Sequence, residues 1–362
     1  MWKRNMSNRF RGTYAEINLN NIESNYNYVK SLLKNKSIMP VVKANAYGHG
    51  VIEVVRKLVS LDVNYFCVSL LEEALEIKEV FPDVNILVMG VVMPNDFATA
   101  SSNKITLTIS NEFQYQGLLE FDDELSIHLK VDTGMNRLGF KDGLVIKEVI
   151  KNIGKNSYIN IEGIFTHFAT ADSDEKYYQF QLDNFKKILA TIDYDFKMIH
   201  ASNSSSTIKY EQNISFTTHC RLGISLYGLT LDKGMSLLKP AFKLKTVISE
   251  IKELAKGEYL GYGITYQAKE NILVGVLPIG YADGFLRQNR DSIAEINGKS
   301  FNTIGTICMD QMFIEIDKTI KYNDTVTLFG GIISIDDVAT RNNTINYEVV
   351  CQITSRVPRE YI

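Results

Sequence analysis

The chain has 362 residues, of which 45% are hydrophobic and 22% are charged, and its formal net charge at pH 7 is -3. This balance is typical of a soluble globular enzyme and gives no electrostatic basis for binding nucleic acid. No apolar run approaches the roughly 18 residues that a membrane-spanning helix needs, and the N-terminal segment lacks the apolar stretch of a signal peptide. The four cysteines form no C-x-x-C pair, which favours reduced thiols in a cytoplasmic protein, and no metal site is expected.

Short apolar runs alternate with amphipathic segments over the first two-thirds of the chain. The first such segment, 20–34, places Ile22, Tyr26, Val29 and Leu33 at helical spacing. The runs expected to form strands are 38–44, 64–70, 84–90, 105–110, 125–132, 159–167, 196–202 and 220–228. Eight strand-and-helix units in roughly 230 residues favour a (β/α)8 barrel of the TIM type. A doubly wound open sheet is the alternative, but no glycine-rich dinucleotide fingerprint supports it.

The pattern changes after about residue 240. Short strand-like runs with glycines between them follow, in 241–263, 270–284 and 302–316. These are typical of an all-β domain of short strands. The sequence therefore predicts an α/β fold with a barrel over 13–238 and a mostly-β domain over 239–362, which residues 1–12 join as a strand.

The stretch PVVKANAYGHG, residues 40–50, places a lysine where the first expected strand ends. Barrel enzymes carry their catalytic groups at the carboxyl ends of the strands. Apolar neighbours would disfavour the charged form of Lys43, and a neutral amine can attack a carbonyl or pyridoxal phosphate. A lysine at a strand end more often reaches water or pairs with an acid, so this spacing alone leaves both interpretations open.

Ten motifs in chain order give that lysine a context. They are VVKANAYGHG, KVDTGMNRLG, GIFTHFATAD, HASNSSS, RLGISLYG, GYGITY, GYADG, ICMDQ, ISIDDV and INYEV with RVPREY. Together they resemble the motifs of alanine racemases, the barrel-type pyridoxal-phosphate enzymes of fold type III. The resemblance implies an isomerase that interconverts L- and D-alanine by two-base proton transfer at Cα, with pyridoxal 5′-phosphate as cofactor. It also implies a bacterial role in supplying D-alanine for cell-wall peptidoglycan.

The resemblance assigns the cofactor-binding groups residue by residue. Lys43 would bind the cofactor covalently and act as one of the two bases, and Arg221 would face the pyridine nitrogen. The other cofactor-binding residues would be Tyr47, Ser204, Gly223 and Ile224 at the phosphate, and His167 and His200 near the ring. From the residues alone, Ser204 also fits a turn or helix cap, and each histidine or Arg221 fits an ordinary structural role.

The run LSIHLKVD has a polar ladder, because strand alternation places His128, Lys130 and Asp132 on one face. A core ion-pair network is one explanation of this ladder. In the family, the lysine matching Lys130 is often carbamylated and orients the arginine matching Arg137. The resemblance thus implies that Arg137 holds the substrate carboxylate region or the cofactor ring hydroxyl, for which an arginine fork is suited.

The second base would be Tyr262 of the β domain, contributed by a partner subunit. A homodimer with shared active sites and a small amino acid as substrate is therefore implied. A tyrosine needs nearby cations to act as a base, and His167 and Arg221 are the candidates. Met309 would donate its backbone N–H to the substrate carboxylate, and the supporting residues would be Tyr281, Cys308 and Asp310. From composition alone, Tyr262 fits an ordinary strand aromatic.

One position departs from the family pattern. Many relatives have a tyrosine immediately before RVPR, where this chain has Ser355. Ser355 is smaller than tyrosine and leaves more room, with a hydroxyl still nearby. Serine or a broader set of small amino acids is therefore the alternative substrate to alanine. A non-catalytic pyridoxal-phosphate-binding barrel protein is a further alternative, although such proteins usually lack a second domain. A related decarboxylase would place a carboxylate, and not Arg221, against the pyridine nitrogen.

Overall fold

The computed structural model describes residues 10–231 and 237–362. Contacts divide these residues into two compact units, which are described separately. The barrel unit is Ile22–Lys239, and the β unit consists of the described residues up to Asn21 together with Pro240–Ile362. Within the described residues, no helix is both long and apolar enough to cross a membrane.

The barrel unit contains a sheet of eight parallel strands in the order β2-β9-β8-β7-β6-β5-β4-β3. A parallel bridge between Val41 and Cys67 closes the sheet, and the Val42 N–H donates to the Cys67 carbonyl at 2.9 Å. The predicted TIM-type barrel is therefore confirmed. The strands are β2 Ser37–Pro40, β3 Tyr65–Val68, β4 Asn85–Val91, β5 Thr106–Ile109, β6 Leu125–Lys130, β7 Ile159–Phe165, β8 Met198–His200 and β9 His219–Leu222.

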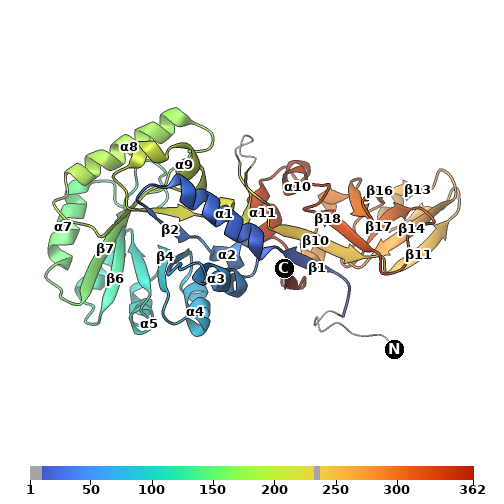
Figure 1. Ribbon diagram of the computed structural model, residues 1–362. Coiled ribbons are helices and arrows are strands. Elements are labelled where there is room, and N and C mark those ends of the chain that lie inside the picture. The colour runs from blue at the N-terminus through green and yellow to red at the C-terminus, as the bar shows by residue number, and fades with distance from the viewer. Residues whose placement is uncertain (1–9, 232–236) are drawn as a thin grey trace. The chain divides into compact units, whose positions relative to one another are not determined.

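Helices cover the outside of this barrel (Figure 1). Helix α1 buries Ile22, Tyr26 and Val29, as the helical spacing predicts, whereas Leu33 lies beyond its last residue. The helices are α1 Leu19–Leu32, α3 Val51–Val59, α4 Leu71–Val80, α5 Phe97–Ser102, α6 Glu112–Leu119, α7 Gly143–Ile153, α8 Glu175–Ala190 and α9 Ser204–Lys209. The helices bury their apolar faces against the outside of the strands. In barrels of this type, functional polar groups lie at the carboxyl ends of the strands.

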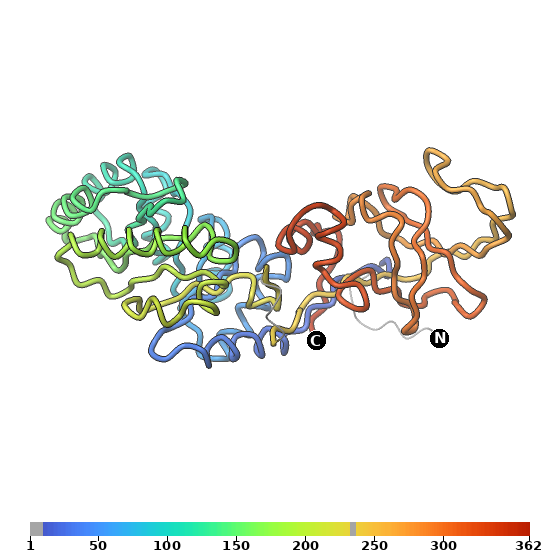
Figure 2. The backbone as a smooth tube through the Cα atoms, turned by 90° about the horizontal axis from the view of Figure 1, so that it is seen from above, coloured from blue at the N-terminus to red at the C-terminus, as the bar shows by residue number. Residues whose placement is uncertain are grey.

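The β unit is built on a nine-stranded sheet, which Figure 2 shows as a tube through the Cα atoms. The strand order is β11-β14-β17-β16-β15-β18-β10-β1-β19. All neighbours are antiparallel except β1 and β19. The strands are β1 Tyr14–Ile17, β10 Phe242–Val247, β11 Glu250–Leu254, β14 Ile272–Leu277, β15 Ile293–Ile296, β16 Lys299–Ile304, β17 Met312–Ile316, β18 Thr325–Phe329 and β19 Arg359–Tyr361. The described helices of this unit are α10 Ile335–Arg341 and α11 Asn346–Cys351, and a two-stranded sheet joins β12 Tyr259–Leu260 to β13 Tyr266–Gln267.

Strand β1 pairs with β10 and β19 and so lies in the β unit, although the predicted barrel range begins at residue 13. Of residues 1–12, which were expected to form a strand of this unit, residues 1–9 lie outside the described part of the chain. Residues 10–12 form a bend before β1.

Candidate active site

Lys43 begins a turn of left-handed helix at the carboxyl end of β2 (α2, Lys43–Tyr47). Residues Ala44–Tyr47 all have φ between 51° and 53°, and Gly48 continues with φ of 80°. Left-handed backbone costs roughly 1–2 kcal/mol for each residue with a Cβ, and such outliers are concentrated at functional sites. The Ala44 N–H donates to Glu73 Oε1 at 2.6 Å, which helps to hold the turn. The strained turn presents the half-buried Lys43 at the end of the barrel where barrel enzymes carry their chemistry.

Three predicted phosphate-binding residues lie together. Ser204 is 3% exposed, and its Oγ accepts hydrogen bonds from the Gly223 N–H at 3.0 Å and the Ser225 N–H at 3.3 Å. A Cβ added at Gly223 would lie 2.9 Å from the Tyr47 hydroxyl oxygen, so glycine is what allows this close approach. Ile224 follows directly and begins a 3₁₀ turn. Hydroxyls and backbone N–H groups in one place are a donor set that suits a phosphate.

His167 lies in a positively charged part of the barrel. It follows β7, and its Nδ1 lies 3.2 Å from Arg221 Nη2. Burial, followed by the charges of Arg221, Lys130, Arg137 and Lys43, holds the pKa of His167 well below its usual value. The imidazole is therefore neutral in a strongly positive environment, which favours anionic ligands.

Lys130 is the last residue of β6 and is 6% exposed. Its Nζ lies 4.9 Å from the centroid of the Phe165 ring. Burial, followed by the charges of Arg221 and Arg137, holds the pKa of Lys130 well below its usual value. This environment therefore disfavours the charged form of the amine and makes the nucleophilic neutral form easier to reach.

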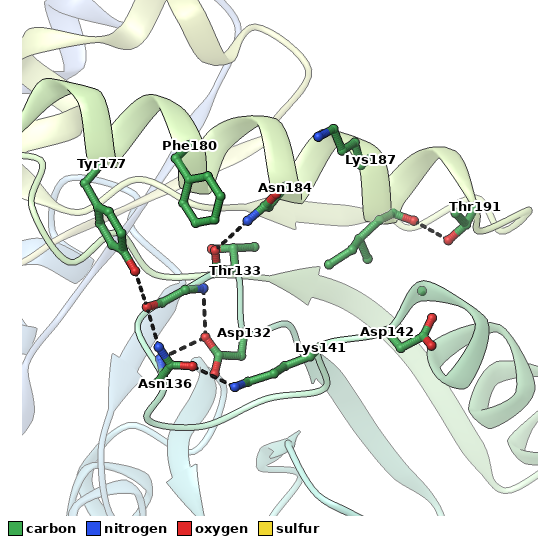
Figure 3. A pocket seen from close by; sticks show the side chains of 13 residues that line it. Asp132, Thr133, Asn136, Lys141, Asp142, Tyr177, Phe180, Asn184, Lys187 and Thr191 are labelled. Atoms are coloured by element: carbon green, nitrogen blue, oxygen red, sulfur yellow. Dashed lines mark hydrogen bonds between the residues drawn. The ribbon is translucent and has the colours of Figure 1, made fainter.

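The other members of the predicted polar ladder are buried too, but they have different partners. Asp132 Oδ1 accepts hydrogen bonds from the backbone N–H groups of Gly134 and Asn136, both at 3.0 Å. Tyr177 of α8 donates to the Gly134 carbonyl at 2.8 Å (Figure 3). These contacts fix the loop that carries the exposed Arg137. Residues that make these contacts also line an open pocket of about 690 Å³. None of the predicted catalytic or cofactor-binding residues lines this pocket.

Arg221 lies on β9 and is 2% exposed. Its Nη1 donates to His200 Nδ1 at 2.6 Å, and its Nη2 donates to the carbonyls of Thr166 at 2.8 Å and Ala201 at 2.9 Å. Burial lowers the pKa of Arg221 to about 10, so the guanidinium remains charged at neutral pH. It therefore presents only hydrogen-bond donors to a ligand.

A second cluster of predicted residues lies in the β unit, where backbone hydrogen bonds join two of the motifs. The Tyr281 N–H donates to the Cys308 carbonyl and the Ala282 N–H to the Met309 carbonyl, both at 3.1 Å. The motifs border a pocket of about 640 Å³ whose lining includes Tyr262, Tyr281, Arg287, Cys308, Met309 and Asp310. The pocket thus collects every site residue predicted for this domain.

The side chains of this pocket are exposed within their own unit. Tyr262 follows Gly261 at the tip between β12 and β13 and is 73% exposed. Asp310 is also exposed and pairs with Arg356 at 2.6 Å. Ser355, the residue that departs from the family pattern, precedes Arg356 and is exposed as well.

Sequence reasoning missed two polar groups of the barrel interior. Glu162 on β7 accepts a hydrogen bond from the Tyr65 hydroxyl at 2.9 Å and lies 3.4 Å from His128 Nε2. The available signal was a carboxylate inside an otherwise apolar run that was expected to be a barrel strand.

A closed eight-stranded barrel with a cationic site at its carboxyl end, followed by a β unit, is the architecture of one class of barrel enzymes. Two family models match the chain. Alanine racemase, N-terminal domain, matches residues 17–231, and alanine racemase, C-terminal domain, matches residues 241–361. The chain belongs to the alanine racemase family.

Named relatives agree with this assignment. Alanine racemase 1 of Bacillus subtilis (strain 168) is 38% identical over 366 residues, which cover 98% of this chain and 94% of the relative. The solved alanine racemase of Clostridium difficile 630 superposes with a TM-score of 0.92 at 36% identity, covering 97% of this chain and 96% of that one. The alanine racemase of Bacillus anthracis, solved with bound L-Ala-P, has a TM-score of 0.92 at 30% identity, covering 98% and 96%.

Proposed function

We propose that this protein is a pyridoxal-phosphate-dependent isomerase that interconverts L- and D-alanine. The observation that carries the proposal is the buried Arg221, whose Nη2 lies 3.2 Å from Nδ1 of the neutral His167, on which the charges of Lys130, Arg137 and Lys43 also act. Such a positive environment favours anionic ligands, and a phosphate and a carboxylate are such groups. The close approach of Gly223 to Tyr47 and Ser204 fits the phosphate of the cofactor.

Two groups would move protons at the substrate. When bound, pyridoxal phosphate would withdraw electrons from the substrate Cα and make its proton acidic. Lys43 Nζ would serve one face of Cα and Tyr262 Oη the opposite face, so that one removes a proton while the other returns one. Arg221 can only donate hydrogen bonds, so it would keep the cofactor ring nitrogen unprotonated and discourage side reactions.

Arg137 and Met309 would position the substrate. The Met309 backbone N–H would bind the substrate carboxylate, and Arg137 would bind the carboxylate region or the cofactor ring hydroxyl. The neutral amine of Lys130 can add to carbon dioxide, forming an N–C bond and releasing one proton. The resulting carbamate anion would pair with Arg137 and orient its guanidinium.

The active form would be a homodimer in which each site uses two chains. Tyr262, Ile264 and Met309 are 73%, 65% and 52% exposed, so the tip of the β unit offers apolar surface for a partner to cover. In this arrangement Tyr262 of the partner subunit would face Lys43. Small amino acids are the substrates, and the protein would act in the cytoplasm to supply D-alanine for peptidoglycan, as expected from the bacterial relatives.

Deuterium exchange tests the reaction directly. Purified protein is incubated with L-alanine in deuterated water, and the products are separated by chirality and analysed by mass. We expect D-alanine carrying one deuterium at Cα, and none with Lys43→Ala. Protein that binds the cofactor but neither inverts nor exchanges alanine would contradict the proposal and point to serine or to a non-catalytic carrier.

Serine, or a broader set of small amino acids, is the second candidate substrate because Ser355 replaces a larger residue. The values of kcat/KM for alanine and serine are compared in the native protein and in Ser355→Tyr. If Ser355 admits serine, the tyrosine variant favours alanine more strongly than the native protein does. An unchanged ratio would show that Ser355 does not set specificity.

A further inference from the structure

We propose that Glu162 is a positioning residue for Arg221 and acts through His128 and His200. These four side chains form one continuous chain of contacts across the barrel interior. The catalytic consequence of this inference rests on the proposed function, whereas the hydrogen-bonding order along the chain rests on geometry alone.

The contacts run inward from β7 to β9. Glu162 Oε2 lies 3.4 Å from His128 Nε2, and His128 Nδ1 lies 2.8 Å from His200 Nε2. His200 Nδ1 lies 2.6 Å from Arg221 Nη1. His128 and His200 are fully buried and Arg221 is 2% exposed, so water does not compete for the contacts among these three side chains, whereas Glu162 at the other end is half-buried.

The donors and acceptors of this chain can be assigned from its two ends. Arg221 only donates, so His200 Nδ1 must accept and the proton of neutral His200 lies on Nε2. That proton is donated to His128 Nδ1, and the proton of neutral His128 therefore lies on its Nε2. It points to Glu162, and an ionised carboxylate only accepts. Both ends impose the same order, so a single tautomer of each ring satisfies every contact.

The charges lie at the two ends of the chain. Burial lowers the pKa of both histidines and, for His128, outweighs Glu162, which raises it. The charge of Arg221 lowers both pKa values further, so both rings are neutral at pH 7. Burial alone would raise the pKa of Glu162, but hydrogen bonds from His128, Lys197 and Tyr65 outweigh it and lower the pKa to about 2. A fixed anion therefore faces a fixed cation through two polarised rings.

This arrangement gives the buried guanidinium a countercharge and a single orientation. The other acceptors of Arg221 in the barrel interior include the neutral carbonyls of Thr166 and Ala201. Without the carboxylate, a neutral arginine becomes easier to form, and a proton on the cofactor ring nitrogen becomes easier to accommodate. The expected side reaction converts alanine to pyruvate: Cα is oxidised to a carbonyl, water supplies its oxygen, and the cofactor aldehyde is reduced to an amine that keeps the nitrogen.

The hydrogen-bonding order is tested by NMR on the full chain labelled with ¹⁵N-histidine. The chain has five histidines, and each NMR signal is assigned by its loss in a variant in which that one histidine is replaced. We expect His128 and His200 to be neutral with the proton on Nε2 at pH 7. A proton on Nδ1 of either ring, or a charged ring, would overturn the assignment whether or not the protein turns over alanine.

The positioning role is tested with Glu162→Gln and with Lys197→Met as its matched control. Both substitutions remove the ion pair between Lys197 Nζ and Glu162 Oε1, which measures 2.9 Å, but only Glu162→Gln removes the charge at the end of the chain. For Glu162→Gln we expect kcat to fall about tenfold, KM to stay within about twofold, and pyruvate formed per racemisation to rise about tenfold. Lys197→Met should match the native protein in all three.

The outcomes separate this inference from the proposed function. A native protein that racemises alanine while Glu162→Gln behaves like Lys197→Met would overturn the positioning role and leave the function standing. A native protein with the expected tautomers and no racemisation would support the hydrogen-bonding order and overturn both the proposed function and the catalytic role given to Glu162.

Discussion

The polar side chains around His167 in the barrel and those of the β-unit pocket differ in how far they are buried. Arg221 and Lys130 are 2% and 6% exposed, whereas Tyr262 and Met309 are 73% and 52% exposed in their own unit. The barrel groups are oriented by contacts inside the barrel. The groups of the β unit line a pocket that is open within their own unit.

The same difference extends to stability. Burying cations beside one another is costly, and only ligands or countercharges offset that cost. The burial of the charged Arg221 therefore costs stability in the barrel, whereas the exposed pocket of the β unit imposes no such cost. Substitutions around His167 should thus affect cofactor binding, stability and catalysis, whereas those at the tip of the β unit should affect catalysis alone.

Among the substitutions, Lys43→Ala in the barrel should have the largest effect on the racemisation rate. In the proposed mechanism it removes one base and the covalent hold on the cofactor, so we expect the racemisation rate to fall by about 10⁴-fold. The measurement is the rate of D-alanine formation at saturating cofactor. Lys141→Ala removes an exposed lysine of the loop beside the Figure 3 pocket and should leave the rate unchanged. A loss of less than about 100-fold in Lys43→Ala would contradict its role as a base.

Acid should destabilise the barrel unit before the β unit, because all five histidines lie between residues 22 and 239. The pKa values of the buried His128 and His200 are lowered, so below about pH 6.5 the unfolded chain binds protons that the folded chain does not. Stability is therefore lost as the pH falls. At pH 5 the loss cannot exceed about 2 kcal/mol for each ring, and it is smaller for His128 because Glu162 raises the pKa of that ring.

Hydrogen exchange at pH 7 and pH 5 in the presence of urea measures this effect, once the rates are corrected for intrinsic pH dependence. Strands β6–β9 should lose protection over this interval, and strands β14 and β17 should change little. Equal losses in both units would show that the histidines do not set the acid response.

Part of the fold and site was predictable because periodicity is local. The apolar runs identify all eight barrel strands, since each must bury its side chains, and they place Lys43 at a strand end. The partner of a strand is not local information, and β1 was therefore assigned to the wrong side of the predicted boundary at residue 13. Most residue assignments depended on the family motifs and not on spacing.

Two features could not be read from the sequence for physical reasons. Ala44–Tyr47 adopts left-handed backbone against the preference of alanine and tyrosine, because surrounding contacts impose it. The chain of contacts from Glu162 to Arg221 joins residues that are 34 and 72 positions apart along the sequence at its first two steps. Nothing in a local pattern indicates which buried polar groups will meet.

Tyr262→Phe tests whether the exposed groups of the β unit affect catalysis without affecting stability. In the proposed mechanism it removes the second base, and the side chain is 73% exposed in its own unit, so we expect kcat to fall about 100-fold with little change in thermal unfolding. Tyr259→Phe, which alters an exposed tyrosine of the same hairpin, is the matched control and should keep the native rate. A Tyr262→Phe enzyme with native kcat would remove this residue from the mechanism.

Mixing the two inactive variants sharpens the comparison further, since each supplies the half that the other lacks. In a mixed dimer of Lys43→Ala and Tyr262→Phe chains, one of the two sites has both bases. If half of the dimers are mixed, about a quarter of the native activity should return. Each variant incubated alone under the same exchange conditions should show no recovery, and no recovery on mixing would exclude a site shared between chains.

Gly223→Ala should have the smallest effect and should fall on cofactor binding. The added Cβ would lie 2.9 Å from the Tyr47 hydroxyl oxygen, which must move, and 3.7 Å from Ser204 Oγ, which is an ordinary contact. We expect the cofactor Kd to rise about tenfold, which corresponds to about 1.4 kcal/mol. Repeating the substitution in Tyr47→Phe removes the closest contact, so the penalty of Gly223→Ala should be smaller there. An equal penalty in both backgrounds would mean that the backbone at Gly223, and not the hydroxyl beside it, requires glycine.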